Sequence, residues 1–314
     1  MIGIKNIASY IPAGRIDNIA QAAAFDRDEG FVLSKIGTPT LSVKDEDEET
    51  SDLCVAAVRN LLAASPALAP EAIGALVVVT QNGDAEGLPH TSAIVQRKLG
   101  LPTGIACFDV SLGCSGYVYG LYVLKGFMEA AGLKNGVLVT CDPYSKIMNR
   151  DDRMTTLLFG DAATATWIGP DPVWRLGPAR FGTDGSGADH LFVRDGFFHM
   201  NGRQVFNFAS LKIIPHIQEV LDEAKMTLDD VDAFCLHQGS GAIVDAIARR
   251  LEGNGDKVIK DMCGAGNTVS STIPLLLERY AFASGWRNLV ISGFGVGLSW
   301  GSALLLRQSG ATAG

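Results

Sequence analysis

The sequence predicts an α/β protein in which a layered sheet is covered by helices. Short apolar runs alternate with longer stretches of helical periodicity along the whole chain. Valine, isoleucine and leucine dominate the apolar runs, and glycine, asparagine or aspartate bounds them, as is typical of buried strands. The 314 residues, 47% of them apolar, suffice for one large domain or two fused ones.

The predicted elements follow one another in a regular order. Buried strands are expected at residues 72–80, 135–142, 233–238 and 287–294. Helices are expected at residues 51–64, 90–99, 114–131 and 208–225, with a further helical stretch at 269–283. The acidic run at 45–49 precedes the first helix, where negative charge favours a helix N-terminus.

The two halves of the chain resemble each other. Residues 71–83 (EAIGALVVVTQNG) are echoed by 229–241 (DDVDAFCLHQGSG), and 134–143 (KNGVLVTCDP) by 286–295 (WRNLVISGFG). Echoes that keep their order indicate an internal duplication. We expect an N-terminal half at 1–170 and a C-terminal half at 171–314, with the boundary where glycine and proline concentrate.

Charge and hydropathy exclude two classes of protein. The chain has 34 acidic against 26 basic residues, a net charge of −8, which argues against binding of nucleic-acid phosphate. No run of about 18 apolar residues predicts a membrane-spanning helix. No secretory signal is visible at the start, so a cytoplasmic protein is expected. The six cysteines have neither disulfide-framework nor zinc-ligand spacing.

Cys114 is the first candidate for chemistry. In residues 108–116 (FDVSLGCSG) a strand-like run turns through Gly113 and enters a helix at or just after the cysteine. A thiol at a helix N-terminus is expected to have a lowered pKa and to react as a nucleophile. The alternative is a core cysteine on a buried helix.

Two further polar residues lie at strand ends or turns in the C-terminal half. His237 ends a predicted strand directly before a Gly-Ser-Gly turn, where sites collect in α/β folds, although a structural histidine is the alternative. Asn267 lies in a glycine turn, and an N-cap or turn role is its alternative. The glycine loop at 293–301 has backbone N–H groups that could face an oxyanion, or it is simply a tight loop.

Six ordered motifs together resemble the β-ketoacyl-acyl-carrier-protein synthase III family of the thiolase superfamily. They are residues 109–116 (DVSLGCSG), 159–163 (FGDAA), 199–206 (HMNGRQVF), 236–238 (LHQ), 266–268 (GNT) and 300–304 (WGSAL). The resemblance runs along almost the whole chain. It implies a thiolase-like five-layered α/β/α/β/α fold made of two pseudo-repeated halves, and a homodimer.

The resemblance implies a decarboxylative Claisen condensation. Cys114 would take an acyl group from acyl-CoA, and His237 and Asn267 would hydrogen-bond the carbonyl of a malonyl thioester, carried by coenzyme A or by acyl carrier protein. The backbone N–H groups of Cys114 and Val296 would hold the oxyanion. The β-ketoacyl thioester product would serve fatty-acid or specialised lipid or polyketide biosynthesis. No metal or other cofactor is implied.

Recognition of the thioester departs from the family pattern. Where the family commonly sandwiches the adenine of coenzyme A between tryptophan and arginine, this chain has Phe31 and Arg153, with Lys35 nearby. A phenyl ring stacks less strongly than an indole.

Around His237, a family arginine and a family asparagine are replaced by Ala242 and Ser240. Arg249 and Arg250 match basic positions expected to meet an acidic carrier protein, whereas a third such position is Asn207. These changes predict weaker dependence on the carrier protein. By resemblance, Leu88 is expected to reach across the dimer and line the partner's acyl pocket, with simple loop packing as the alternative.

Four other functions compete with condensation. Some relatives pass the acyl group to an O, N or S acceptor without decarboxylation, but the His/Asn pair favours condensation. An aldol reaction of the hydroxymethylglutaryl-CoA synthase kind needs a carboxylate where this chain has Gln81. The order Cys, His, Asn also occurs in papain-like peptidases, although their local signature is absent. A catalytically inactive partner subunit is the non-enzymatic alternative.

Overall fold

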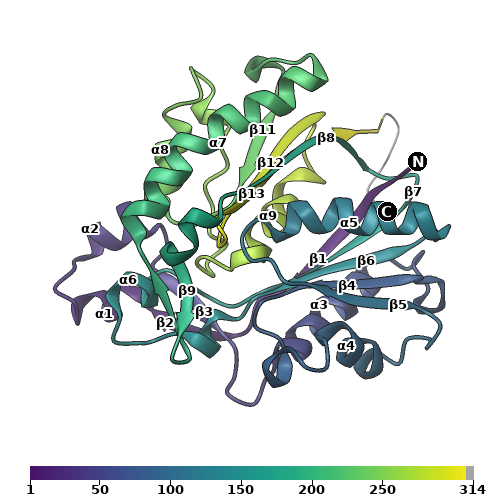
Figure 1. Cartoon of the computed structure of the whole chain (residues 1–314), viewed down its shortest axis with the longest axis horizontal. Coiled ribbons are helices and arrows are strands. Elements are labelled where there is room, and N and C mark those ends of the chain that lie inside the picture. Colours follow the sequence, from purple (N-terminus) through teal and green to yellow (C-terminus); the bar gives the residue numbers. More distant parts are fainter. Residues whose placement is uncertain (309–314) are drawn as a thin grey trace.

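The structure, a computed structural model, describes residues 1–308 and contains one nine-stranded mixed sheet (Figure 1). Its N-terminal strands are β1 (Ile2–Tyr10), β4 (Ala75–Val79), β5 (Ala106–Val110), β6 (Gly136–Cys141) and β7 (Ala163–Pro170). Its C-terminal strands are β8 (Trp174–Thr183), β11 (Ala233–Leu236), β12 (Asn288–Gly295) and β13 (Ser299–Arg307). The strand order is β11-β12-β13-β8-β1-β7-β6-β4-β5.

The sheet repeats one topology in its two halves. From the middle outward, the N-terminal half runs β1-β7-β6-β4-β5 and the C-terminal half runs β8-β13-β12-β11, with matching parallel and antiparallel pairs. A short parallel bridge from Val258 to Phe234 stands where a strand equivalent to β5 would pair. A single pair, Ile4 with Trp174, joins β1 to β8. The two pseudo-repeated halves predicted from the sequence echoes are therefore present.

Helices complete five layers around the two halves of the sheet. Helices α3 (Thr50–Ala64) and α4 (Thr91–Leu99) cover the outer face of the N-terminal half, and α7 (Gly202–Ala224) and α8 (Gly241–Ala248) lie outside the C-terminal half. Helices α5 (Gly116–Ala131) and α9 (Thr272–Leu276) contact strands of both halves and form the middle layer. The order is α/β/α/β/α, as predicted.

Some helix boundaries differ from the prediction. Helix α7 begins at Gly202, six residues before the expected start, because the Asn201 side chain accepts a hydrogen bond from the Gln204 N–H (3.2 Å) and caps it. The stretch at 269–283 is not one helix: a 3₁₀ turn at Val269–Ser271, α9 and a π-helical turn at Leu277–Ala281 follow one another. The acidic run ends at Glu49, which caps α3.

Short elements inserted into both halves gather on one side of the sheet (Figure 1). From the N-terminal half come β2 (Gly14–Asp17), β3 (Thr40–Val43), α1 (Asn18–Ala23), α2 (Glu29–Phe31) and α6 (Arg153–Thr156). From the C-terminal half comes the hairpin of β9 (Leu191–Arg194) and β10 (Phe197–Met200). Residues of these elements wall a cavity. Among residues 1–308, no helix is both long and apolar enough to cross a membrane.

Candidate active site

Cys114 lies two residues before α5, in the loop that follows β5. Its side chain is buried, and strand β12 passes so close that a Cβ atom on Gly295 would lie 2.7 Å from the Cys114 Sγ. A Cβ on Gly293 would lie 2.6 Å from the Cys114 carbonyl oxygen. Two glycines of the predicted glycine loop thus let the C-terminal half approach the cysteine of the N-terminal half.

The expected lowering of the Cys114 pKa is wrong for this state of the protein. Burial raises the pKa of the Cys114 thiol to about 12, and the charge of Asp142 adds to the rise. Hydrogen bonds from the backbone N–H groups of Val296 and Cys114 lower the pKa, but by less than burial raises it. Cys114 is therefore a neutral thiol although it lies near a helix N-terminus, because the effect of desolvation on its pKa outweighs that of the helix dipole.

His237 follows β11 and is buried beside the cavity. Its backbone N–H donates to Ser292 O of β12 (2.9 Å), and its Nδ1 lies 2.8 Å from Thr272 Oγ1. Burial lowers the pKa of the imidazole to about 3, so the ring is neutral at physiological pH. The other ring nitrogen, Nε2, has no hydrogen-bond partner among the described residues.

Asn267 belongs to the C-terminal half but rests on the N-terminal half. Its backbone pairs with residues 158–160 through hydrogen bonds to Leu158 O and from Gly160 N–H. Its side-chain Oδ1 accepts from Val269 N–H (2.9 Å), and its Nδ2 donates to Gly239 O (3.2 Å). One amide hydrogen remains for a ligand. The side chain bonds neither to the imidazole nor to the thiol, which argues against the peptidase arrangement, where the third group orients the histidine.

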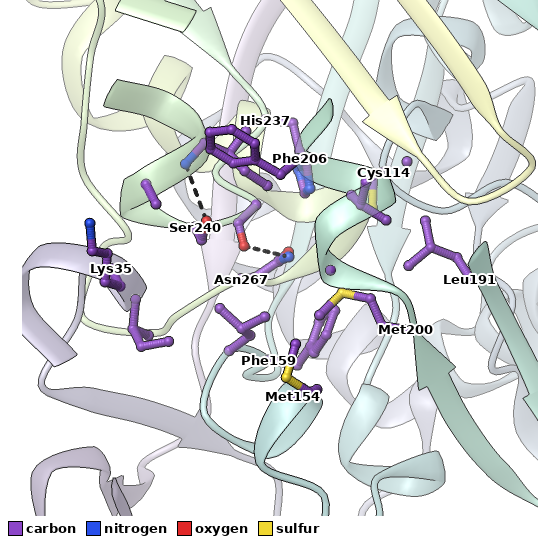
Figure 2. A pocket seen from close by; sticks show the side chains of 18 of the residues that line it. Lys35, Cys114, Met154, Phe159, Leu191, Met200, Phe206, His237, Ser240 and Asn267 are labelled. Atoms are coloured by element: carbon purple, nitrogen blue, oxygen red, sulfur yellow. Dashed lines mark hydrogen bonds between the residues drawn. The ribbon is translucent and has the colours of Figure 1, made fainter. Parts of the chain in front are cut away.

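Cys114, His237 and Asn267 line one cavity of about 350 Å³ (Figure 2). Apolar side chains form most of its wall: Ile36, Met154, Leu158, Phe159, Leu191, Met200, Val205, Phe206, Ile243 and Phe294. Figure 2 shows Cys114 and Leu191 on one side of this space, Lys35 on the other, and Asn267 between them. The cavity thus extends from Cys114 past Asn267 to Lys35.

Three predicted recognition residues line the same cavity. Phe31, Lys35 and Arg153 come from α2, the π-helical turn after it, and α6. Arg27 lines it too and was missed by the sequence analysis; its guanidinium lies 5.5 Å from the centre of the Phe31 ring. The spacing of four residues between Arg27 and Phe31 was the available signal that their side chains lie together. The turn that joins them is irregular, so the sequence did not show that both face the same side.

The remaining predicted site residues lie outside this wall. Leu88 is 84% exposed and projects from a loop before α4. Arg249 and Arg250 are exposed at the end of α8, whose first turn carries Ser240 and lines the cavity. Val296 meets the site through its backbone N–H, which bonds the Cys114 sulfur.

Comparisons with known proteins identify relatives of this chain. Residues 108–185 match the family model described as 3-oxoacyl-[acyl-carrier-protein] synthase III, and residues 221–307 match the model of its C-terminal part. A β-ketoacyl-[acyl-carrier-protein] synthase III of Deinococcus deserti is 33% identical over 315 residues, covering 95% of this chain and 89% of the relative.

Solved structures agree with these matches. A 3-oxoacyl-(acyl-carrier-protein) synthase III has a TM-score of 0.91 at 32% identity, over 97% of this chain and 99% of the other. The priming β-ketosynthase of the R1128 polyketide biosynthetic pathway has a TM-score of 0.87 at 27% identity, over 98% and 97%. With these matches over almost its full length, the chain belongs to the β-ketoacyl-acyl-carrier-protein synthase III family.

Proposed function

We propose that this enzyme is an acyltransferase that condenses an acyl group held on Cys114 with a malonyl thioester. In the first half-reaction the sulfur attacks the carbonyl carbon of acyl-CoA, the bond to the coenzyme sulfur breaks, and the thiol proton leaves with that sulfur. The backbone N–H groups of Cys114 and Val296 stabilise the oxyanion. Because the free thiol is neutral, its proton is lost as the new bond forms.

His237 and Asn267 serve the second half-reaction. The malonyl C–C bond to the carboxylate breaks, CO₂ leaves, and the electron pair becomes an enolate whose oxygen accepts hydrogen bonds from both side chains. The enolate carbon attacks the acyl carbonyl and the Cys114 sulfur departs. A neutral imidazole with its proton on Nε2 fits this role, and the Thr272 hydroxyl then donates to Nδ1.

The observation that carries the proposal is that one cavity unites a thiol, an imidazole and a carboxamide from two halves of the chain. The family comparisons support the same chemistry. No step as written needs a metal or other cofactor. The product would feed fatty-acid, specialised lipid or polyketide biosynthesis in the cytoplasm.

The basic end of the cavity supports coenzyme A as the carrier of the acyl group. Arg27, Lys35 and Arg153 form none of the ion pairs found among residues 1–308, so their charges are available to phosphate groups. Phe31 offers a ring face for a base. Arg249 lies about 9 Å along α8 from Ile243 of the cavity wall, given 1.5 Å per residue. Arg249 and its neighbour Arg250 would meet an acidic carrier protein that delivers the malonyl group.

A homodimer is proposed through the free edge of β5. This strand ends the sheet, all of its residues are half-buried, and Val123 and Phe127 of the neighbouring α5 expose 40% and 37% of their surface. The unpaired backbone groups of an edge strand invite pairing with a second copy. In such a dimer the exposed Leu88 would reach the partner's acyl pocket.

Intact-protein mass spectrometry with a panel of acyl-CoAs tests the first step. We expect one acyl group on the wild type and none on Cys114→Ala, because no other thiol faces the cavity. Cys107→Ala is the matched control, since Cys107 is the most exposed of the other cysteines, and it should acylate normally.

Adding malonyl-CoA or a malonyl carrier protein to the acylated enzyme tests the second step. Release of CO₂ and a β-ketoacyl thioester support condensation. Transfer of the acyl group to an alcohol, amine or thiol with no CO₂ release would replace the proposal by the acyl-transfer alternative. Complete loss of the rate when malonyl-CoA replaces the malonyl carrier protein would contradict the predicted weaker dependence on the carrier protein.

A further inference from the structure

A buried carboxylate lies behind the active site and takes no part in the chemistry above. Asp142 follows β6 and has no exposed surface. Its Oδ2 accepts from the Ser270 hydroxyl (2.6 Å) and its Oδ1 from the Gln81 backbone N–H (2.7 Å). The Ser270 backbone N–H also bonds to the carboxylate, and Thr80 Oγ1 lies 3.5 Å away.

These bonds join the carboxylate to the segment that carries one proposed enolate donor, Asn267, and supports the other, His237. Ser270 lies midway between Asn267, which lines the cavity, and Thr272, which holds the Nδ1 of His237. The next residue, Ser271, bonds to Thr140 O (3.1 Å) and other groups of the N-terminal half. The 267–272 segment of the C-terminal half is thus held on the ends of N-terminal strands, and Asp142 supplies the charged contact.

Burial of the Asp142 carboxylate costs free energy, and its hydrogen bonds offset only part of that cost. Burial raises the pKa of Asp142 to about 6 despite the lowering effect of the bonds from Ser270, Gln81 and Thr80. An isosteric amide would avoid the burial of charge, but its NH₂ group would face donors that now bind the second carboxylate oxygen, so it could not keep all of these contacts.

We propose that Asp142 is a positioning residue for the condensation half-reaction: its carboxylate holds the 267–272 segment so that Asn267 and the Thr272-supported imidazole point at one enolate oxygen. The inference rests on the proposed function and deepens it. Acyl transfer to Cys114 uses backbone N–H groups from other segments, so it does not require this contact. The two half-reactions should therefore respond differently when the carboxylate is lost.

The charge of Asp142 also acts on the nucleophile. It raises the pKa values of Cys114, Cys141 and Tyr144, which face it from the start of α5, from β6 and from the turn after β6. The groups that face it from the end of β4 and from the 269–271 turn are neutral amides and hydroxyls. Cys114, Cys141 and Tyr144 stay protonated near pH 6, so Asp142 is the group of this cluster that titrates there.

The test compares both half-reactions in Asp142→Asn, in Ser270→Ala and in the wild type. Acylation of Cys114 is timed by intact mass, and condensation by CO₂ release from malonyl-CoA after acylation. In Asp142→Asn we expect condensation to fall at least tenfold while acylation stays within twofold or becomes faster. Ser270→Ala removes only one donor and should lower the ratio of condensation rate to acylation rate by less. The double variant should lower this ratio no further than Asp142→Asn does.

Two readouts separate positioning from mere structural support. In Asp142→Asn the pH profile of Cys114 alkylation by iodoacetamide should move to lower pH, because a charge that raises the thiol pKa is gone. In the wild type, condensation should decline relative to acylation below about pH 6, and this decline should vanish in Asp142→Asn. Asp84→Asn is the control: Asp84 is also buried, but its carboxylate accepts from the Ser51 N–H (2.9 Å) and the Ser51 hydroxyl (2.5 Å) of α3 and from no residue of the 267–272 segment.

The outcomes are distinct. A wild type that is not acylated, or that releases no CO₂, contradicts the proposed function itself. A wild type that condenses, with an unchanged ratio of half-reactions in Asp142→Asn, overturns the role of Asp142. The same shift of ratio in Asp84→Asn would overturn it as well, because any buried carboxylate would then have the effect.

Discussion

The hydroxyl of Thr272 bears on which ring nitrogen of His237 carries the proton. A neutral imidazole has one proton, so Nε2 can donate to an enolate only if Nδ1 accepts from Thr272 Oγ1, 2.8 Å away. The same hydroxyl lies 3.2 Å from Val269 O, which competes for its proton. The condensation rate therefore depends on a residue that touches no substrate.

Thr272→Val should slow condensation about 5- to 10-fold, the equivalent of one hydrogen bond worth about 1 kcal/mol, and leave acylation unchanged. Thr272→Ser keeps the hydroxyl and should restore the rate. The measurement is CO₂ release from enzyme that is already acylated. A loss in the serine variant as large as that in the valine variant would show that the hydroxyl alone does not set the rate and would contradict this role.

At the scale of elements, the approach of β12 to the start of α5 creates the site. The backbone of β12 lies against both the sulfur and the carbonyl oxygen of Cys114. Ser115 Oγ and Ser299 Oγ, 2.8 Å apart, tie the loop after the cysteine to the first residue of β13. Because these elements come from different halves, the site depends on the packing between the halves.

Gly295→Ala should abolish acylation, because its Cβ would lie 2.7 Å from the Cys114 sulfur and displace it or the strand. Overpacking of this kind costs about 1–3 kcal/mol of stability. Gly285→Ala is the control, since a Cβ there meets no atom within 4 Å. Acylation rates and thermal unfolding of both variants check the expectation, and normal acylation of Gly295→Ala would contradict the close approach.

Elements with a clear hydrophobic period were predictable from the sequence, and contacts between distant loops were not. The runs that became β4, β6, β11 and β12 are apolar and bounded by turn residues, so their positions followed directly. The 269–283 stretch has the composition of a helix, but its first residue, Val269, has a positive φ of 54° and begins a 3₁₀ turn. Tertiary hydrogen bonds of Ser270 and Ser271 impose that shape.

In the candidate site, too, features of the local sequence were predictable and effects of tertiary packing were not. Cys114, His237 and Asn267 follow strands or glycine turns, so motif order made them candidates, and the structure brings them to one cavity. The lowered thiol pKa was predicted wrongly because the helix dipole can be read from local sequence, whereas desolvation and the Asp142 charge depend on packing. Arg27 and Thr272 carry no motif of their own, so only the fold reveals them.

At the scale of the whole molecule, the described chain leaves an apolar surface at one end of the sheet. Phe108 of β5 and Phe127 of α5 stack edge to face, with ring centres 5.3 Å apart, and Phe127 remains 37% exposed. Asp109, the only charged residue of β5, accepts hydrogen bonds from the Thr91 and Ser92 N–H groups at the start of α4. Its charge is satisfied internally and does not oppose pairing of the edge with a second copy.

Phe127→Arg should therefore convert a dimer into a monomer, because a cation placed in an apolar interface loses its hydration without gaining a partner. Light scattering coupled to size-exclusion chromatography measures the mass, and Leu211→Arg, a change at a 63% exposed leucine on α7, is the matched control. If Leu88 of a second copy completes the acyl pocket, the monomeric variant should also lose its preference among acyl-CoAs. Leu88→Ala should lose the same preference while the protein remains dimeric. A wild type that is monomeric at micromolar concentration, or a Phe127→Arg variant that keeps both its mass and its acyl preference, would remove β5 from the interface and Leu88 from the pocket together.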